Sequence, residues 1–192
     1  MNTPKRYSKQ GLWRLFLVCA FPTHVWTIIL VLRDFSWLTE RTNAWDAVGV
    51  AAYGMIFALF EAGLLFATVV LLGFLLPKGW EEEKRISLLS TAILIISVWA
   101  ILGQLYFLWG ISVPEGVMHA LAGQAHPLRI LYAAVFVLVV PTVLPPLYLI
   151  FRSERARRFA GELFDRLALL TGLYLILDLL GLVIIITRNL HA

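Results

Sequence analysis

The chain contains few charged residues and one cysteine, and it lacks the signature motifs of common enzymes. Only 15% of its 192 residues are charged, whereas about a quarter of an ordinary soluble domain is charged. Because Cys19 is the single cysteine, the chain forms no internal disulfide. We find no Walker A loop and no G-x-S-x-G, G-x-G-x-x-G or C-x-x-C motif. These absences argue against a P-loop enzyme or an intramembrane serine protease, and we predict no cofactor.

Apolar residues are abundant and occur in long runs. They make up 60% of the chain, and the mean hydropathy is +0.84. Short charged segments separate five runs, which span residues 15–32, 47–76, 86–109, 130–151 and 167–187. Each run reaches or approaches the ~20 residues that a helix needs to cross ~30 Å of hydrocarbon. The sequence therefore predicts an all-α, polytopic integral membrane protein, in which five transmembrane helices form one domain over residues 1–192.

The basic residues are distributed unevenly between the two sides of such a bundle. Of the 16 Lys and Arg residues, 12 fall on the side of the N-terminus and four on the other side. Since basic residues are enriched in cytoplasmic segments, we predict a cytoplasmic N-terminus and an outer C-terminus in the cell membrane. The net charge of +4 then reflects topology and lipid headgroups, and we predict no binding to nucleic acid.

Three segments outside or within the runs carry local signals. Ser112 and Glu115 have the S-x-x-E spacing of a capping box, and Gly123 is a typical helix stop, so we predict a short outer-face helix near 113–122. The segment 152–166 reads as an extension of the fourth helix or as an amphipathic segment at the inner headgroups. Three prolines in the fourth run should kink or break that helix in its inner half, namely Pro141, Pro145 and Pro146.

Four polar residues lie inside the apolar runs: His24, Glu61, Gln104 and Asp178. An ionised carboxylate at the bilayer centre costs at least ~2.5–3.5 kcal/mol, so such groups face the interior, bind a partner or keep a proton. One hypothesis is a cluster in which His24 pairs with Glu61 or Asp178 and binds a substrate or lipid, or passes protons. The other is that these groups only hydrogen-bond neighbouring helices, which is also the role we expect of Gln104.

Two further sets of residues are candidates for binding at the membrane surfaces. The cluster of Arg152, Arg155, Arg157 and Arg158 should attract anionic headgroups on the cytoplasmic side, at ~1 kcal/mol per basic residue. On the outer side, Glu115, His119 and His126 are weak candidates for a zinc site. They match no known zinc motif and have no cysteine to join them, so we predict no metal.

The sequence supports two interpretations of function. The first is a non-catalytic multi-pass membrane subunit or accessory protein that acts through helix–helix and lipid contacts, with other membrane subunits as partners. The second is a small transporter or lipid-handling membrane protein with a polar site at the midplane. A membrane enzyme ranks third, because the chain offers no catalytic motif.

Overall fold

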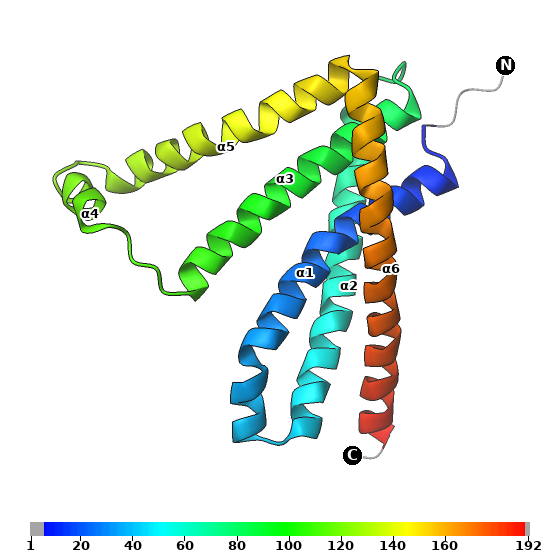
Figure 1. Ribbon diagram of the computed structural model, residues 1–192, viewed down its shortest axis with the longest axis vertical. Coiled ribbons are helices and arrows are strands. Elements are labelled where there is room, and N and C mark those ends of the chain that lie inside the picture. The colour runs from blue at the N-terminus through cyan, green and yellow to red at the C-terminus, as the bar shows by residue number, and fades with distance from the viewer. Residues whose placement is uncertain (1–5, 191–192) are drawn as a thin grey trace.

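The computed structural model describes residues 6–190, which form six helices and no strand (Figure 1). The long ones are α1 (Lys9–Arg41), α2 (Ala44–Leu75), α3 (Glu82–Leu108), α5 (Pro127–Arg152) and α6 (Glu154–Leu190), and α4 (Glu115–Ala122) is short. All five long helices are long and apolar enough to cross a membrane. The predicted all-α fold with five such helices is confirmed, and each helix begins before the apolar run that predicted it.

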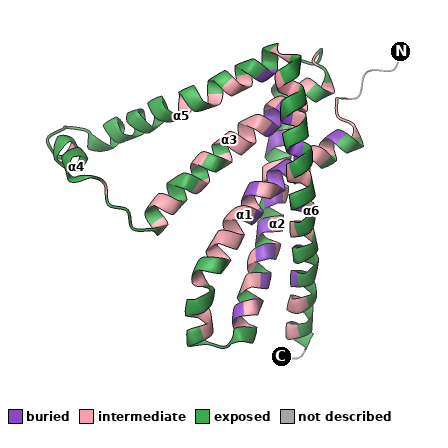
Figure 2. Ribbon diagram, in the orientation of Figure 1, coloured by how far each residue is buried: buried purple, intermediate pink, exposed green. Residues whose placement is uncertain are grey.

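The helices form a body and an arm. Helices α1, α2 and α6 pack together as the body, while α3 and α5 meet near the body and diverge as they lean away from it, with α4 beside the outer end of α5 (Figure 1). Buried residues concentrate on α1 and α2, and α5 is exposed along most of its length (Figure 2). Helix α1 joins the two parts, because it contacts α2 and α6 of the body and α3 of the arm.

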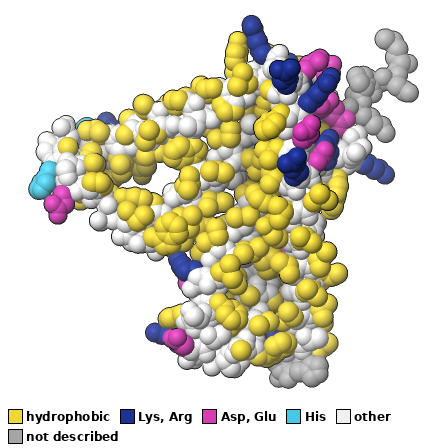
Figure 3. Space-filling view, viewed as in Figure 1, with side chains coloured by type: hydrophobic (Ala, Val, Ile, Leu, Met, Phe, Trp, Pro, Cys, Tyr) yellow, Lys and Arg dark blue, Asp and Glu magenta, His cyan; other side chains and the backbone are white. Residues whose placement is uncertain are grey.

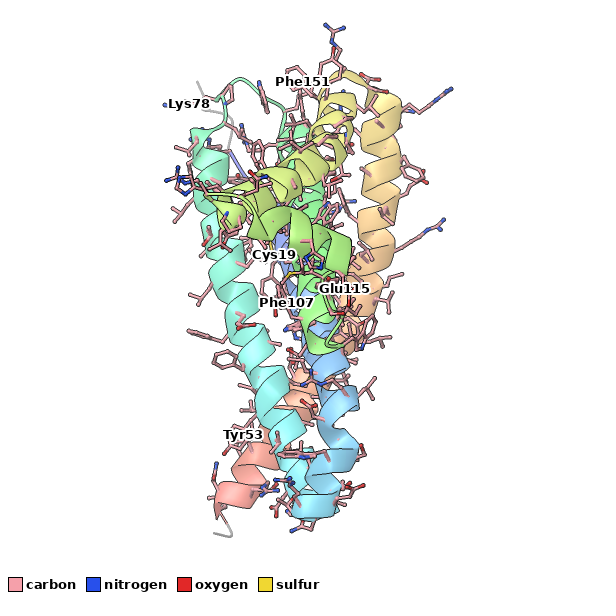
Figure 4. The ribbon with its side chains drawn as sticks, turned by 90° about the vertical axis from the view of Figure 1, so that its left-hand side faces the viewer. Cys19, Tyr53, Lys78, Phe107, Glu115 and Phe151 are labelled. Atoms are coloured by element: carbon pink, nitrogen blue, oxygen red, sulfur yellow. The ribbon has the colours of Figure 1, made fainter. Side chains whose placement is uncertain are left out.

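The two ends of the molecule differ in charge. We call one the basic end; it holds the N-terminal segment, the α2–α3 loop and the α5–α6 junction, and Lys and Arg side chains gather there (Figure 3). Figure 4 places Lys78 and Phe151 at this end and Tyr53 near the opposite end, with Cys19 between them. Because the arm leans, Glu115 lies between Lys78 and Tyr53 in height rather than level with Tyr53.

Two apolar clusters fix the arm to the body in the half nearer the basic end. Leu15 and Cys19 of α1 meet Val69 of α2 and Leu89 of α3 in the first cluster. The second joins four buried residues of α1, α5 and α6: Val18, Ile150, Ala160 and Phe164. No comparable cluster of described residues covers the distal halves of α3 and α5, so the arm is attached at its root only.

Polar contacts hold α6 along the body. Arg14 of α1 bonds Asp165 at the basic end, and Arg188 bonds Asp46 of α2 at 2.6 Å at the opposite end. Between them, Gly181 lies close to α2, since a Cβ added there would sit 3.2 Å from the Ala52 carbonyl oxygen. A Cβ at this position would be crowded, so glycine favours this close approach of the α6 and α2 backbones.

The capping box predicted at Ser112 and Glu115 is wrong. Helix α4 begins at Glu115, Pro114 occupies the N-cap position, and no side chain caps the helix. Proline has no N–H and fixes its own φ, so it ends the preceding extended segment, and the helix starts after it. The helix ends at Ala122 with Gly123 as its C-cap, as predicted.

The structure rules out one of the two alternatives predicted for the fourth helix and one of those predicted for the segment after it, while the kink and the amphipathic segment stay predictions. Helix α5 is continuous through all three internal prolines, so it is not broken. It ends at Arg152, and residues 154–166 form the first turns of α6 rather than an extension of α5. Ser153 marks the boundary, because its Oγ accepts a hydrogen bond from Ala156 N at 3.3 Å in the manner of an N-cap.

Candidate functional site

The structure separates the predicted midplane residues into two places. His24 and Asp178 pair with each other between α1 and α6, with His24 Nε2 2.9 Å from Asp178 Oδ2. Both are buried, at 0% and 3% exposure. Glu61 and Gln104 instead line a cavity on another side of α1. The hypothesis that His24 pairs with Asp178 matches this geometry, whereas pairing of His24 with Glu61 does not.

The hydrogen-bond geometry limits where the protons of the His24–Asp178 pair can lie. His24 Nδ1 lies 2.7 Å from the Ala20 carbonyl oxygen, which only accepts, so Nδ1 carries a hydrogen and donates it. One proton then lies between His24 Nε2 and Asp178 Oδ2, on the nitrogen as an ion pair or on the oxygen as a neutral pair. Both forms have no net charge, which is what a group buried in a membrane bundle requires.

Neighbouring residues of α6 enclose this pair. Thr171 Oγ1 donates to the Leu17 carbonyl oxygen of α1 at 3.1 Å, and the Tyr174 ring stacks on His24 with centroids 5.9 Å apart. Thr171, Tyr174 and Asp178 are spaced three and four residues apart and therefore share one helix face. The sequence reasoning missed Thr171 and Tyr174, although their spacing from Asp178 was a usable signal. Among residues 6–190, the contacts of this face hold α6 against α1, and we call them the interhelical clamp.

Glu61 and Gln104 face each other across a cavity of about 250 Å³ that we call the fork. The fork lies where α3 leaves α1 and α2. Its lining includes Thr23, Trp26, Glu61, Leu65, Ser97 and Gln104. No hydrogen bond or ion pair with any residue from 6 to 190 engages the Glu61 carboxylate, and Glu61 is exposed.

A second cavity of about 610 Å³ continues from the fork along α1 and α2, and we call it the α1–α2 groove. Trp26 and Glu61 line both cavities, so the two are adjoining. The groove is mainly apolar and ends near Asp34, whose carboxylate accepts two hydrogen bonds from Arg33 at 2.7 and 2.8 Å. Together the two cavities form one continuous, mostly apolar groove. The Glu61 carboxylate, which has no hydrogen bond or ion pair with residues 6–190, lies where the two cavities meet.

This arrangement is energetically unusual for a membrane helix. An ionised carboxylate near the bilayer centre costs at least ~2.5–3.5 kcal/mol unless it is solvated or paired. The chain supplies His24 for Asp178, but supplies no partner for Glu61 among residues 6–190. An occupant of the fork that bonds Glu61 would remove this cost.

A third cavity, of about 540 Å³, opens at the basic end among α1, α3 and α6. Three of the six charged residues that line it are engaged within the chain: Arg14 pairs with Asp165, and Glu82 accepts from the backbone N and Oγ of Ser8 at 2.8 and 2.7 Å. The buried Ser90 hydroxyl lines it without a partner. These contacts chiefly join α1 to α3 and α6.

Arg85 is a buried residue that the sequence reasoning missed. It is one of the 12 basic residues counted for the N-terminal side, yet it is 1% exposed. Its guanidinium donates to the carbonyl oxygens of Arg6 at 2.6 Å, Pro77 at 3.2 Å and Trp80 at 3.2 Å. Its position in the first turn of α3, directly after Lys84 in a charged segment, gave no sequence signal that its side chain turns inward.

The arginine cluster predicted to bind lipid is split by the structure. Arg152, Arg155 and Arg158 are exposed at the basic end. Arg157 instead turns towards α5, where its guanidinium donates to the Ile150 carbonyl oxygen at 3.3 Å and lies 3.9 Å from Glu154. Three of the four candidates are therefore available to headgroups, while Arg157 joins α6 to the end of α5.

The candidates for a zinc site do not gather into one. Glu115 and His119 are exposed on α4, and His126 is exposed ahead of α5. Among residues 6–190 no group of three or more His, Cys, Asp or Glu side chains has the geometry to hold a metal ion.

Comparison of the chain with known protein families, with curated proteins and with solved structures finds no match.

Proposed function

We propose that the chain is a multi-pass protein of the cell membrane, with the basic end and the N-terminus in the cytoplasm and the C-terminus outside. The 12-to-4 asymmetry of Lys and Arg supports this orientation, and so does the gathering of basic side chains at one end (Figure 3). In this arrangement α4 belongs to the outer side, and the exposed Arg152, Arg155 and Arg158 face anionic headgroups.

Cysteine labelling in intact cells tests the orientation. Lys78 and Glu40 are exposed near opposite ends of the body. A membrane-impermeant maleimide should label Glu40→Cys from outside and should label Lys78→Cys only after permeabilisation. Cys19 is buried and serves as the unlabelled background. Labelling of both positions from the same side would contradict the proposal.

We further propose that the protein binds an amphipathic molecule from the membrane in the fork, which is the lipid-handling or transport class of function. The observation that carries this proposal is the Glu61 carboxylate, which lines a cavity among α1, α2 and α3 without a partner from residues 6–190. Membrane-ligand sites are mostly apolar, with a few polar groups that orient the ligand. The fork and the α1–α2 groove have this composition.

The leaning arm explains how a ligand reaches the fork. Because α3 and α5 contact the body only near their root, the fork lies at the vertex between α3 and the α1–α2 pair (Figure 1). A molecule dissolved in the bilayer reaches this vertex laterally, without crossing a headgroup layer. The polar part then meets Glu61 and Gln104, while the apolar part lies in the α1–α2 groove.

Filling the fork should weaken ligand retention. Ala100 of α3 lines the fork, whereas Ala133 of α5 is exposed away from it. We expect native mass spectra after mild detergent extraction to show one amphipathic adduct per chain on the parent and on Ala133→Trp. Ala100→Trp should retain about tenfold less, a difference of about 1.4 kcal/mol in binding. Equal adducts on the two variants would rule out the fork as the binding place.

A second candidate function is that of an accessory subunit. Its supporting observation is α5, a 26-residue helix of which only Ile150 is buried. Such a helix has apolar surface on most sides and is suited to packing against a partner helix in the membrane. The two candidates differ in their dependence on the fork, since subunit assembly through α5 should survive Ala100→Trp.

A further inference from the structure

The charge of the fork and of the α1–α2 groove is of one sign. No Lys or Arg of the described residues lines either cavity. The acidic groups there are Glu61 and Asp34, and Asp34 already accepts both hydrogen bonds of Arg33. A ligand in these cavities therefore meets an unpaired negative charge at Glu61. Such a site favours cations and disfavours anions, because an anion beside an ionised carboxylate is repelled in a poorly solvated place.

Aromatic side chains beside Glu61 have the same preference. Trp26 lines both cavities, and Phe57 and Tyr53 line the α1–α2 groove. The face of an aromatic ring attracts ammonium groups through its quadrupole, with Trp the strongest of the common rings. A carboxylate next to a tryptophan thus recognises a positive centre from two directions, through charge pairing and through cation–π attraction.

The hydroxyl of Thr23 is also arranged as an acceptor. Thr23 Oγ1 donates its hydrogen to the Ala20 carbonyl oxygen at 2.9 Å, which leaves its lone pairs to accept. A ligand that donates N–H bonds would satisfy both Thr23 and Glu61, whereas a ligand that only accepts would satisfy neither. This preference disfavours a carboxylate, a sulfate or an ether, and for ligands that carry N–H groups it adds to the attraction of positive charge.

We infer that the fork selects amphipathic cations, in which an amine or quaternary ammonium centre is attached to an apolar body. The positive centre lies beside Glu61 and Trp26, and the apolar body extends along the α1–α2 groove past Phe57. This inference rests on the proposed function and deepens it by naming the chemical class of the ligand. Single-chain, lipid-like amines and compact soluble lipophilic cations share this chemistry.

Two ions of nearly the same shape and opposite charge test the selection. Tetraphenylphosphonium and tetraphenylborate are both propeller-shaped and apolar, so charge is their main difference. In equilibrium dialysis with the purified chain in a neutral maltoside detergent, the parent should bind tetraphenylphosphonium at least about tenfold more tightly than tetraphenylborate. Dodecylamine and dodecanol serve as competitors of bound tetraphenylphosphonium. If dodecylamine displaces it and dodecanol does not, the site takes lipid-like amines. If dodecylamine does not displace it, the site takes compact cations.

Variants of Glu61 identify the group that selects. Glu61→Gln keeps the size and hydrogen-bonding capacity of the side chain but removes its charge. It should lower tetraphenylphosphonium affinity about tenfold and leave tetraphenylborate affinity unchanged, while Glu61→Asp should keep the cation preference. Glu40→Gln, at an exposed position outside both cavities, is the matched control and should match the parent.

The outcomes separate this inference from the proposed function. If both ions bind the parent equally and Ala100→Trp loses both, the fork is a ligand site without charge selection, and only the inference fails. If neither ion nor dodecylamine binds, and the native mass spectra of parent and Ala100→Trp also agree, the proposed function fails as well. A cation preference that persists in Glu61→Gln likewise overturns the inference.

Discussion

Replacing Asp178 with leucine should destabilise the protein by about 3–5 kcal/mol, the usual loss when one member of a buried pair is removed. His24 would keep its bond to Ala20 but would have no partner for Nε2 in a place with 0% exposure. Ordinary interhelical hydrogen bonds in membranes contribute only ~0.6 kcal/mol on average and ~1.7 at most. A measured loss well above that range would therefore identify a clamp rather than a routine contact.

Equilibrium unfolding in mixed detergent micelles measures this effect, and two further variants control it. Asp178→Asn should be mild, because an asparagine amide donates to Nε2 while His24 stays neutral. The double variant His24→Leu with Asp178→Leu should be more stable than Asp178→Leu alone, since no buried polar group is left unpaired. If Asp178→Leu proves as mild as Asp178→Asn, the clamp contributes little to stability.

The second large effect is expected at Arg85. Arg85→Met should lower the free energy of unfolding by at least about 3 kcal/mol, because a hydrogen bond from a charged group contributes about 1.5–3 kcal/mol and Arg85 makes three. The carbonyl oxygens of Arg6, Pro77 and Trp80 would lose their shared donor. The N-terminal segment and the α2–α3 loop would then separate, which limited proteolysis detects.

An exposed arginine provides the matched control for this prediction. Arg155→Met removes the same side chain at an exposed position of α6, where we expect a change within about 0.5 kcal/mol. Arg85→Lys keeps the charge but not the planar array of donors, so it should fall between the parent and Arg85→Met. Equal stability of Arg85→Met and Arg155→Met would show that the three backbone contacts contribute nothing.

The apolar runs predicted the helices because burial of apolar surface and helix length are local properties of the sequence. The path of the chain between runs depends on contacts that are not local. Ser153 ends α5 and caps the start of α6 although Ala156 stands three residues on, whereas Ser112, which has the capping-box spacing with Glu115, caps no helix. The lean of the arm likewise depends on where the two apolar clusters end. Because several helices contribute to each cluster, the sequence of one helix does not show this.

The candidate site was predictable only in part, for a similar reason. Depth in the membrane follows from position within a run, so His24, Glu61 and Asp178 were recognised as groups of similar depth. Which of them meet depends on the rotation of each helix. Asp178 turns towards α1 and pairs with His24, whereas Glu61 turns towards the fork. Trp26 and Thr23 were missed because a tryptophan and a threonine in an apolar run are ordinary residues until a cavity lies beside them.

The central claim is that the fork binds an amphipathic cation from the membrane, and photolabelling in native membranes tests it most directly. The probe is dodecylamine with a diazirine in the middle of its chain, and mass spectrometry of the digested protein locates the label. Because the apolar chain extends along the α1–α2 groove, we predict labelling on the segments of α1 and α2 that carry Trp26 and Phe57, suppressed by excess dodecylamine and absent in Ala100→Trp. Labels spread over α5 and α6, unaffected by competitor or by Ala100→Trp, would contradict the account.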